Sequence, residues 1–268
     1  RFVFYSTIFV VPIFILIPWT KMPVNYFEWL GAFLTGVSFA FGLWTMYLGI
    51  QKSEISHIGP LIGGTIPLFI LFLSWWFLGE LISDRQLLAV ILLALGSLLI
   101  SSEYTNKKQG LHKAIFWGVL AAFLFAMSHT ATKYLYNEMG FFSGFVWGRS
   151  FTGIFGICLL FIPGFLESII NEKKIYSRVK ISLGKLTLIA INKILAVISL
   201  LLIQYAIYLG SVTIVNALAG VQYAFLLILV GVLSKFYPQR FREEYSHAEI
   251  VQEILSVIII SVGLYLLL

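Results

Sequence analysis

Long apolar runs separated by short polar segments dominate the chain. The polar segments are TKMPVN, GELISDR, SSEYTNKKQG, NEMG, NEKKIYSRVK and KFYPQRFREE, and they carry the proline, glycine and charged residues typical of loops. The runs lack the period-two alternation of a membrane β-strand, and about 20 apolar residues cross a bilayer as a helix. We therefore predict nine membrane-spanning helices, at residues 1–20, 27–50, 55–79, 85–102, 112–136, 141–165, 183–209, 212–234 and 248–268.

The order of these runs repeats along the chain. The run that begins at Arg1 and the run that begins at Arg149 both end near a proline, and each is followed by a long run ending in the letters YLG. Two units with an odd number of helices in each are inverted in the membrane, which is a common construction in transporters. We expect these units at residues 1–105 and 111–268. The first unit shows one helix fewer than the second, so we expect a first helix to be missing from this chain.

Composition supports a polytopic, all-α integral membrane protein. Of its 268 residues, 60% are hydrophobic and 11% are charged, whereas soluble domains have about 45–50% and 25%. The net charge of +6 comes mainly from basic residues in the polar segments, so we expect no nucleic-acid partner. Cys158 is the only cysteine, and no disulfide or zinc framework can be built from it. We expect neither a metal nor a cofactor.

Two stretches of the chain resemble the EamA family of the drug/metabolite transporter superfamily. In ISHIGPLIGGTIPLFILFLSWWFLGELISDRQLLAVILLALGSLLIS, a helix with small residues and proline leads into Phe77-Leu78-Gly79-Glu80, a turn and a final helix containing glycine. The stretch YAIYLGSVTIVNALAGVQYAFLLILVGVLS resembles the matching part of a second repeat, although LSKFYPQRFREE replaces the LGE turn. The resemblance implies a bundle of ten helices in two inverted five-helix repeats, of which nine are present here.

The orientation in the membrane is predicted differently by charge and by resemblance. Twelve of the 18 Lys and Arg residues fall in loops on one side of the predicted spans. Basic residues favour the cytoplasmic side, which places the C-terminus outside. The resemblance implies cytoplasmic termini instead, so both orientations stay open.

The eighth run carries a polar stripe that we interpret as a candidate wall of a solute site. Thr213, Asn216, Gly220 and Tyr223 are spaced i, i+3, i+7 and i+10, which places them on one face of a helix, and Gln222 lies beside that face. An uncharged polar wall with an aromatic edge suits a small amphipathic solute. Close helix packing is the alternative explanation for its glycine. The candidate substrate residues are Thr213, Asn216, Gln222 and Tyr223, with Gln204, Trp44 and Tyr47 from other helices.

Ionisable residues inside the runs are further candidates, because a charge in the bilayer is costly unless it is paired or hydrated. Lys193 can reach back toward the basic side, bind an anion, or pair with Glu253. His129 suits proton coupling or an interhelical hydrogen bond. Arg149 suits capping or head-group anchoring, or a role in coupling. Glu80 lies between two helices, where it suits a turn-locking residue rather than a proton carrier.

An enzyme is not expected, because Asp84 is the only aspartate, the four histidines are scattered and no phosphate-binding glycine loop is present. The resemblance implies a plasma-membrane transporter that moves a small organic metabolite, such as an amino acid, by alternating access and in the direction of efflux. Protons are a candidate coupling ion. A carrier of nucleotide-linked or lipid-linked sugars and a non-transporting membrane scaffold or partner subunit stay open as alternatives. The oligomeric state does not follow from the sequence.

Overall fold

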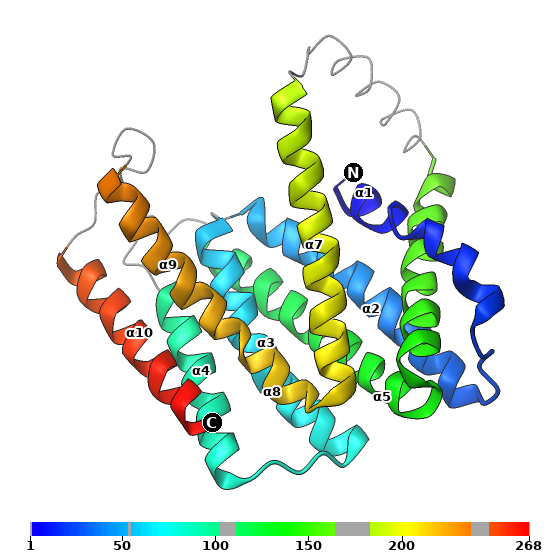
Figure 1. Cartoon of the computed structure of the whole chain (residues 1–268), viewed down its shortest axis with the longest axis horizontal. Helices are drawn as coiled ribbons and strands as arrows, with labels where there is room; N and C mark the ends of the chain where they lie inside the picture. Colours follow the sequence, from blue (N-terminus) through cyan, green and yellow to red (C-terminus); the bar gives the residue numbers. More distant parts are fainter. Residues whose placement is uncertain (1, 53–54, 102–110, 164–182, 237–246, 268) are drawn as a thin grey trace. The chain divides into compact units, whose positions relative to one another are not determined.

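The computed structural model describes residues 2–52, 55–101, 111–163, 183–236 and 247–267, and every regular element in these ranges is helical (Figure 1). Most are α-helices, and two are 3₁₀ helices, written η. In chain order they are α1 (Phe2–Ile8), η1 (Val11–Trp19), α2 (Tyr26–Ile50), α3 (Ile55–Leu78), α4 (Asp84–Ser101), α5 (Leu111–Cys158), η2 (Leu159–Phe161), α7 (Leu183–Leu209), α8 (Val212–Ala217), α9 (Ala219–Phe236) and α10 (His247–Leu267).

Five helical stretches within these described ranges are long and apolar enough to cross a membrane. They are Phe2–Trp19, Tyr26–Ile50, Ile58–Leu78, Lys113–Phe161 and Thr187–Leu209. The fourth has 49 residues, and as a helix it would extend about 74 Å, more than twice the ~30 Å thickness of the hydrocarbon core. The prediction of a helical membrane protein is therefore confirmed.

Several predicted runs have internal breaks in the structure. The run predicted at 1–20 consists of α1 and η1, with Pro12 and Pro18 in or beside the 3₁₀ segment. The run predicted at 212–234 is divided between α8 and α9 by a turn at Leu218. The runs predicted at 112–136 and 141–165 are both in α5, where Gly140 has a non-helical backbone with φ of 76°. Residues 164 and 165 lie outside the described residues.

The described chain forms two compact units. Unit 1 contains Arg1–Ala40 and Ala131–Gly210, and unit 2 contains Phe41–Thr130 and Ser211–Leu268. The long helices α2 and α5 each contribute one part to each unit.

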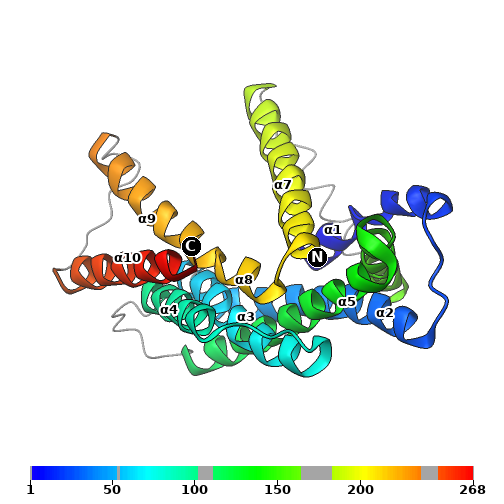
Figure 2. The same cartoon turned by 60° about the horizontal axis from the view of Figure 1, so that its bottom comes forward.

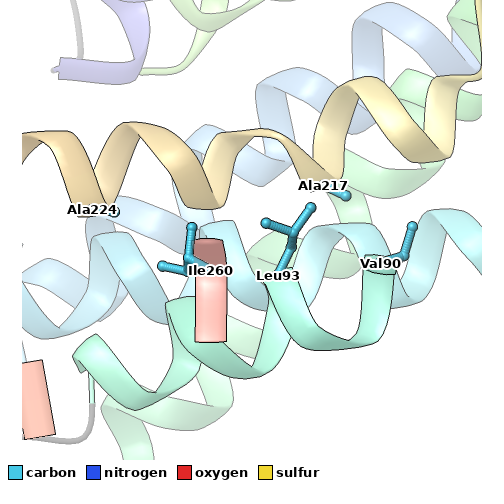
Figure 3. Close-up of a cluster of buried hydrophobic side chains, with 5 residues drawn as sticks. All are labelled: Val90, Leu93, Ala217, Ala224 and Ile260. Atoms are coloured by element: carbon cyan, nitrogen blue, oxygen red, sulfur yellow. The ribbon is translucent and has the colours of Figure 1, made fainter. Parts of the chain in front are cut away.

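The core of unit 2 is built from close contacts between apolar helices. Helix α4 packs against both α3 and α10, and two views show α4 running beside α10 (Figures 1 and 2). Their packing encloses a small cluster of buried side chains from α4, α8, α9 and α10, namely Val90, Leu93, Ala217, Ala224 and Ile260 (Figure 3). Small side chains in this cluster let the helices approach closely, which drives helix association in lipid through van der Waals contact.

The core of unit 1 includes a close crossing of α2 and α5. A Cβ atom added to Gly36 would lie 2.5 Å from Phe151 Cβ and 2.5 Å from the backbone nitrogen of Thr152. The two helices are also joined by an edge-to-face contact between Trp29 and Trp147, with ring centroids 5.1 Å apart. Unit 1 therefore fixes part of α2 directly against the second half of α5.

Local sequence signals explain where two of the helices begin. Ser83 and Gln86 form a reciprocal capping box at the start of α4, in which each side chain accepts a hydrogen bond from the other residue's backbone N–H, at 3.3 and 3.0 Å. At α2, the Glu28 carboxylate accepts from the backbone N–H of Val24 at 2.6 Å and of Asn25 at 3.5 Å. These bonds satisfy donors that a helix N-terminus leaves without intrahelical partners.

Candidate functional site

A buried hydrogen bond joins α5 to α7 within unit 1. The hydroxyl of Tyr136 donates to Oε1 of Gln204 at 2.8 Å, and the two side chains are only 1% and 2% exposed. Buried polar groups of this kind are costly unless they are hydrogen-bonded, so each side chain satisfies the other. Gln204 was a predicted candidate, whereas Tyr136 was not.

The break at Gly140 determines what surrounds this pair. Its φ of 76° lies in the left-handed region, which glycine enters without the steric penalty that a Cβ brings. The chain after the break returns over Tyr136: a Cβ on Gly144 would lie 2.9 Å from the Tyr136 ring and 3.1 Å from the backbone of Leu135. Residues before and after position 140 therefore line the same site.

Aromatic rings from α5 and α7 gather beside the Tyr136–Gln204 pair. We call the set of Tyr136, Phe141, Phe145, Tyr205 and Tyr208 the aromatic cluster. The ring of Phe141 is central, since its centroid lies 5.2 Å from that of Tyr205, 5.8 Å from Tyr208, 5.4 Å from Tyr136 and 5.9 Å from Phe145. Such rings present flat apolar faces together with the polar hydroxyl groups of the tyrosines.

Arg149 lies at one end of the aromatic cluster and is 7% exposed. Its guanidinium carbon is 4.6 Å from the ring centroid of Phe39 on α2 and 5.9 Å from that of Phe145, one turn earlier on α5. Among the described residues, no hydrogen bond or ion pair to a carboxylate accompanies this cation. The arrangement is a buried positive charge held between aromatic faces.

Lys133 serves a different purpose in the same unit. Its Nζ donates to the backbone carbonyls of Ile207 at 2.9 Å and Tyr208 at 3.0 Å. These carbonyls belong to the last turn of α7, where a helix leaves acceptors unsatisfied and carries a partial negative charge. Lys133 therefore anchors the end of α7 to α5.

The predicted polar stripe lies in unit 2, where its members make separate contacts. The Thr213 side chain is fully buried and donates to Oε2 of Glu80 at 3.0 Å, while its oxygen lies 2.9 Å from Oγ of Ser74. The Asn216 amide donates to the Val212 carbonyl of its own helix at 2.8 Å. These two members of the stripe thus bond to protein groups.

The remaining stripe residues differ in their surroundings. A Cβ on Gly220 would lie 2.7 Å from Ser97 Oγ and 3.1 Å from the Leu93 carbonyl, which is the close helix packing named as the alternative explanation. Gln222 is exposed, and the side chain of Tyr223 lies outside the described residues.

Other predicted residues are distributed over both units. In unit 1, Lys193 is exposed on α7. In unit 2, Trp44 is exposed and stacks on Phe41 with ring planes 8° apart. Tyr47, His129 and Glu253, also in unit 2, are half-buried.

The structure joins the predicted residue Gln204 to Tyr136, which was not predicted, and it joins two predicted residues, Thr213 and Glu80. The sequence contains no signal that singles out Tyr136, because tyrosines near the ends of membrane spans are commonly interfacial anchors. Phe39 likewise looks like any other aromatic residue of an apolar helix.

Comparison with known proteins gives one family match, over the first part of the chain. The EamA-like transporter family matches residues 1–102, which contain the LGE turn at Glu80. No curated protein matches the chain. By this match, the first 102 residues are similar to the EamA-like transporter family, and the helices described above are long and apolar enough to cross a membrane several times.

Proposed function

We propose that this protein moves a small organic metabolite, an amino acid or a similar solute, out of the cell across the plasma membrane by alternating access. The family match supports transport as the general activity. We further propose that residues 111–268 form a second EamA repeat, inverted with respect to the first. Alternation then exposes a solute site formed between the repeats first to one side and then to the other.

The observation that carries the proposal is the buried polar and cationic set in unit 1. Arg149, Tyr136 and Gln204 lie within apolar helices and are at least nine-tenths buried. A membrane scaffold needs only close apolar packing, and a buried arginine would weaken it. A transporter, in contrast, needs polar groups that replace the water lost by its solute. We therefore favour transport over the scaffold.

Solute movement in reconstituted liposomes tests this function. The purified full chain is inserted into liposomes preloaded with unlabelled solute, and uptake of the labelled solute by exchange is measured for amino acids, sugars and nucleotides. We expect exchange of one solute class above protein-free liposomes. Exchange of nucleotide-linked sugars would point to the alternative carrier, and no exchange of any class would favour the scaffold.

A variant pair links the activity to the site. Tyr136→Phe removes the buried hydroxyl that donates to Gln204, and we expect a reduced exchange rate. Tyr265→Phe removes a hydroxyl from a tyrosine that is 71% exposed on α10, and we expect no change. The same liposomes with an imposed pH gradient test proton coupling, since a coupled carrier accumulates solute only in the presence of the gradient.

A further inference from the structure

We propose that Arg149 binds a carboxylate group of the transported solute, and that the aromatic cluster contacts the apolar body of the same molecule. This inference rests on the proposed transport function and names the solute class: a small organic acid, including amino acids, with an apolar or aromatic body.

The first argument is the energetic state of Arg149 in the protein without solute. An arginine inside a membrane helix is costly unless it is paired or hydrated. The rings of Phe39 and Phe145 attract the cation but carry no formal negative charge, so they do not neutralise it. The described residues supply no carboxylate to Arg149. The carboxylate of a bound solute supplies the missing negative charge.

The guanidinium group of Arg149 is chemically suited to a carboxylate. A guanidinium presents a planar set of N–H donors that matches both oxygens of a carboxylate, and aromatic rings that stack on its faces leave its edge available for such bonds. Arg149 is a single cation between two rings. One cation balances one carboxylate, whereas the diphosphate of a nucleotide-linked sugar carries at least two negative charges.

The aromatic cluster forms an apolar surface next to the cation of Arg149. Phe145 contacts both Arg149 and Phe141, and Phe141 contacts the rings of Tyr205 and Tyr208. A molecule whose carboxylate meets Arg149 can therefore place its hydrocarbon part along the aromatic cluster. The Tyr136–Gln204 pair lies at the same cluster and offers polar atoms for a second substituent, such as an amino group.

Three probes, each with a phenyl ring, separate the contributions of the carboxylate and ammonium groups to binding. They are 3-phenylpropanoate, which has only the carboxylate, L-phenylalanine, which has carboxylate and ammonium groups, and 2-phenylethylamine, which has only the ammonium group. Binding to the full chain in detergent is measured by the shift of its thermal unfolding and by titration calorimetry. We expect the two carboxylates to bind and the amine not to bind. Binding of phenylalanine alone identifies an amino acid site, because the ammonium group is then also required.

Arg149→Gln is the decisive variant. We expect carboxylate binding at least about tenfold weaker, because a charge-assisted, bidentate contact is lost. We also expect the solute-free variant to be no less thermostable than the wild type, because an uncompensated buried charge has been removed. A capping or anchoring role for Arg149 predicts the opposite change in stability. Arg85→Gln is the matched control, since it removes an arginine from an exposed position at the start of α4, and carboxylate binding should stay within about twofold.

Arg149→Lys decides the question if the Gln variant does not fold. It retains the charge but loses the planar fork, and we expect weaker carboxylate binding. The proposal is overturned if the Gln variant binds the carboxylates as well as the wild type does, or if the Lys variant does so when only that variant folds. It is also overturned if the wild type binds only the amine, or binds neither carboxylate. Exchange of solutes without a carboxylate would reject the Arg149 site while transport stands. Arg149-dependent binding without any exchange would reject transport while the anion site stands.

Discussion

The buried contact of Thr213 with Glu80 and Ser74 predicts a measurable stabilisation of unit 2. Thr213 has one hydroxyl proton, which it donates to the Glu80 carboxylate at 3.0 Å, so Ser74 must donate to Thr213 across 2.9 Å. Thr213→Val keeps the shape of the side chain and removes both bonds. Hydrogen bonds to charged groups contribute about 1.5–3 kcal/mol. Interhelical bonds measured in membranes average about 0.6 kcal/mol, with a maximum of about 1.7.

We expect Thr213→Val to lower the free energy of unfolding by about 1.5–3 kcal/mol, because the bond to the carboxylate outweighs the neutral one. Ser74→Ala should cost about 0.6 kcal/mol and Glu80→Gln about 1 kcal/mol, since an amide oxygen still accepts, but less strongly. Denaturation in mixed micelles followed by tryptophan fluorescence measures these values, and the chain contains seven tryptophans.

A double-mutant cycle isolates the contact itself. Combining Thr213→Val with Glu80→Gln should give a loss smaller than the sum of the single losses by at least about 0.5 kcal/mol, because Glu80→Gln weakens a bond that Thr213→Val has already removed. The reasoning is refuted if Thr213→Val unfolds within about 0.5 kcal/mol of the wild type, or if the two changes are additive within about 0.3 kcal/mol.

Three further changes test local features of the two units by the same unfolding measurement. Gly36→Ala should lower the free energy of unfolding by about 1–3 kcal/mol, because the new Cβ would lie 2.5 Å from atoms of α5. Gly59→Ala is the control, since a Cβ there meets nothing within 4 Å, and it should be neutral or stabilising. Equal effects of the two changes would contradict the close crossing of α2 and α5. Gly79→Ala should cost about 1 kcal/mol because φ is 62° there, and an unchanged midpoint would argue against that turn. Lys133→Met should expose α7 to limited proteolysis by removing two bonds to its last turn, and a wild-type cleavage rate would reject this anchoring role.

Glu80 illustrates how far local reasoning reaches. Its place after Gly79 in a polar turn between two apolar helices predicts a turn-locking residue, and the structure gives its carboxylate a bond to Thr213 together with a backbone bond from its own N–H to the Ser74 carbonyl at 3.2 Å. The turn itself follows from short-range features, namely a glycine that tolerates positive φ and the Ser83 and Gln86 capping box. The contact between Glu80 and Thr213, which lies 133 residues further along the chain, does not follow from such short-range features.

The polar stripe shows where helical periodicity fails as a guide. Thr213 and Asn216 have the right spacing for one face of a helix, but the turn at Leu218 separates them from Gly220 and Tyr223. Asn216 bonds to its own backbone, a local option that short polar side chains take readily. Spacing alone says which residues share a face, and it says nothing about whether that face meets a helix, a solute or lipid.

The sequence by itself determined that this chain is helical and lies in a membrane, because hydropathy and polar punctuation act over 20 residues and depend on no distant contact. It also identified the EamA resemblance and an arginine inside the run predicted at 141–165. Only the tertiary structure decided that Arg149 lies between Phe39 and Phe145, and that Tyr136 bonds to Gln204, 68 residues further along the chain. The physical reason is that lipid is as apolar as the helices, so hydropathy cannot choose between helix faces. That choice is made by the shapes of small residues, by backbone breaks such as Gly140 and by the few polar groups that must find partners.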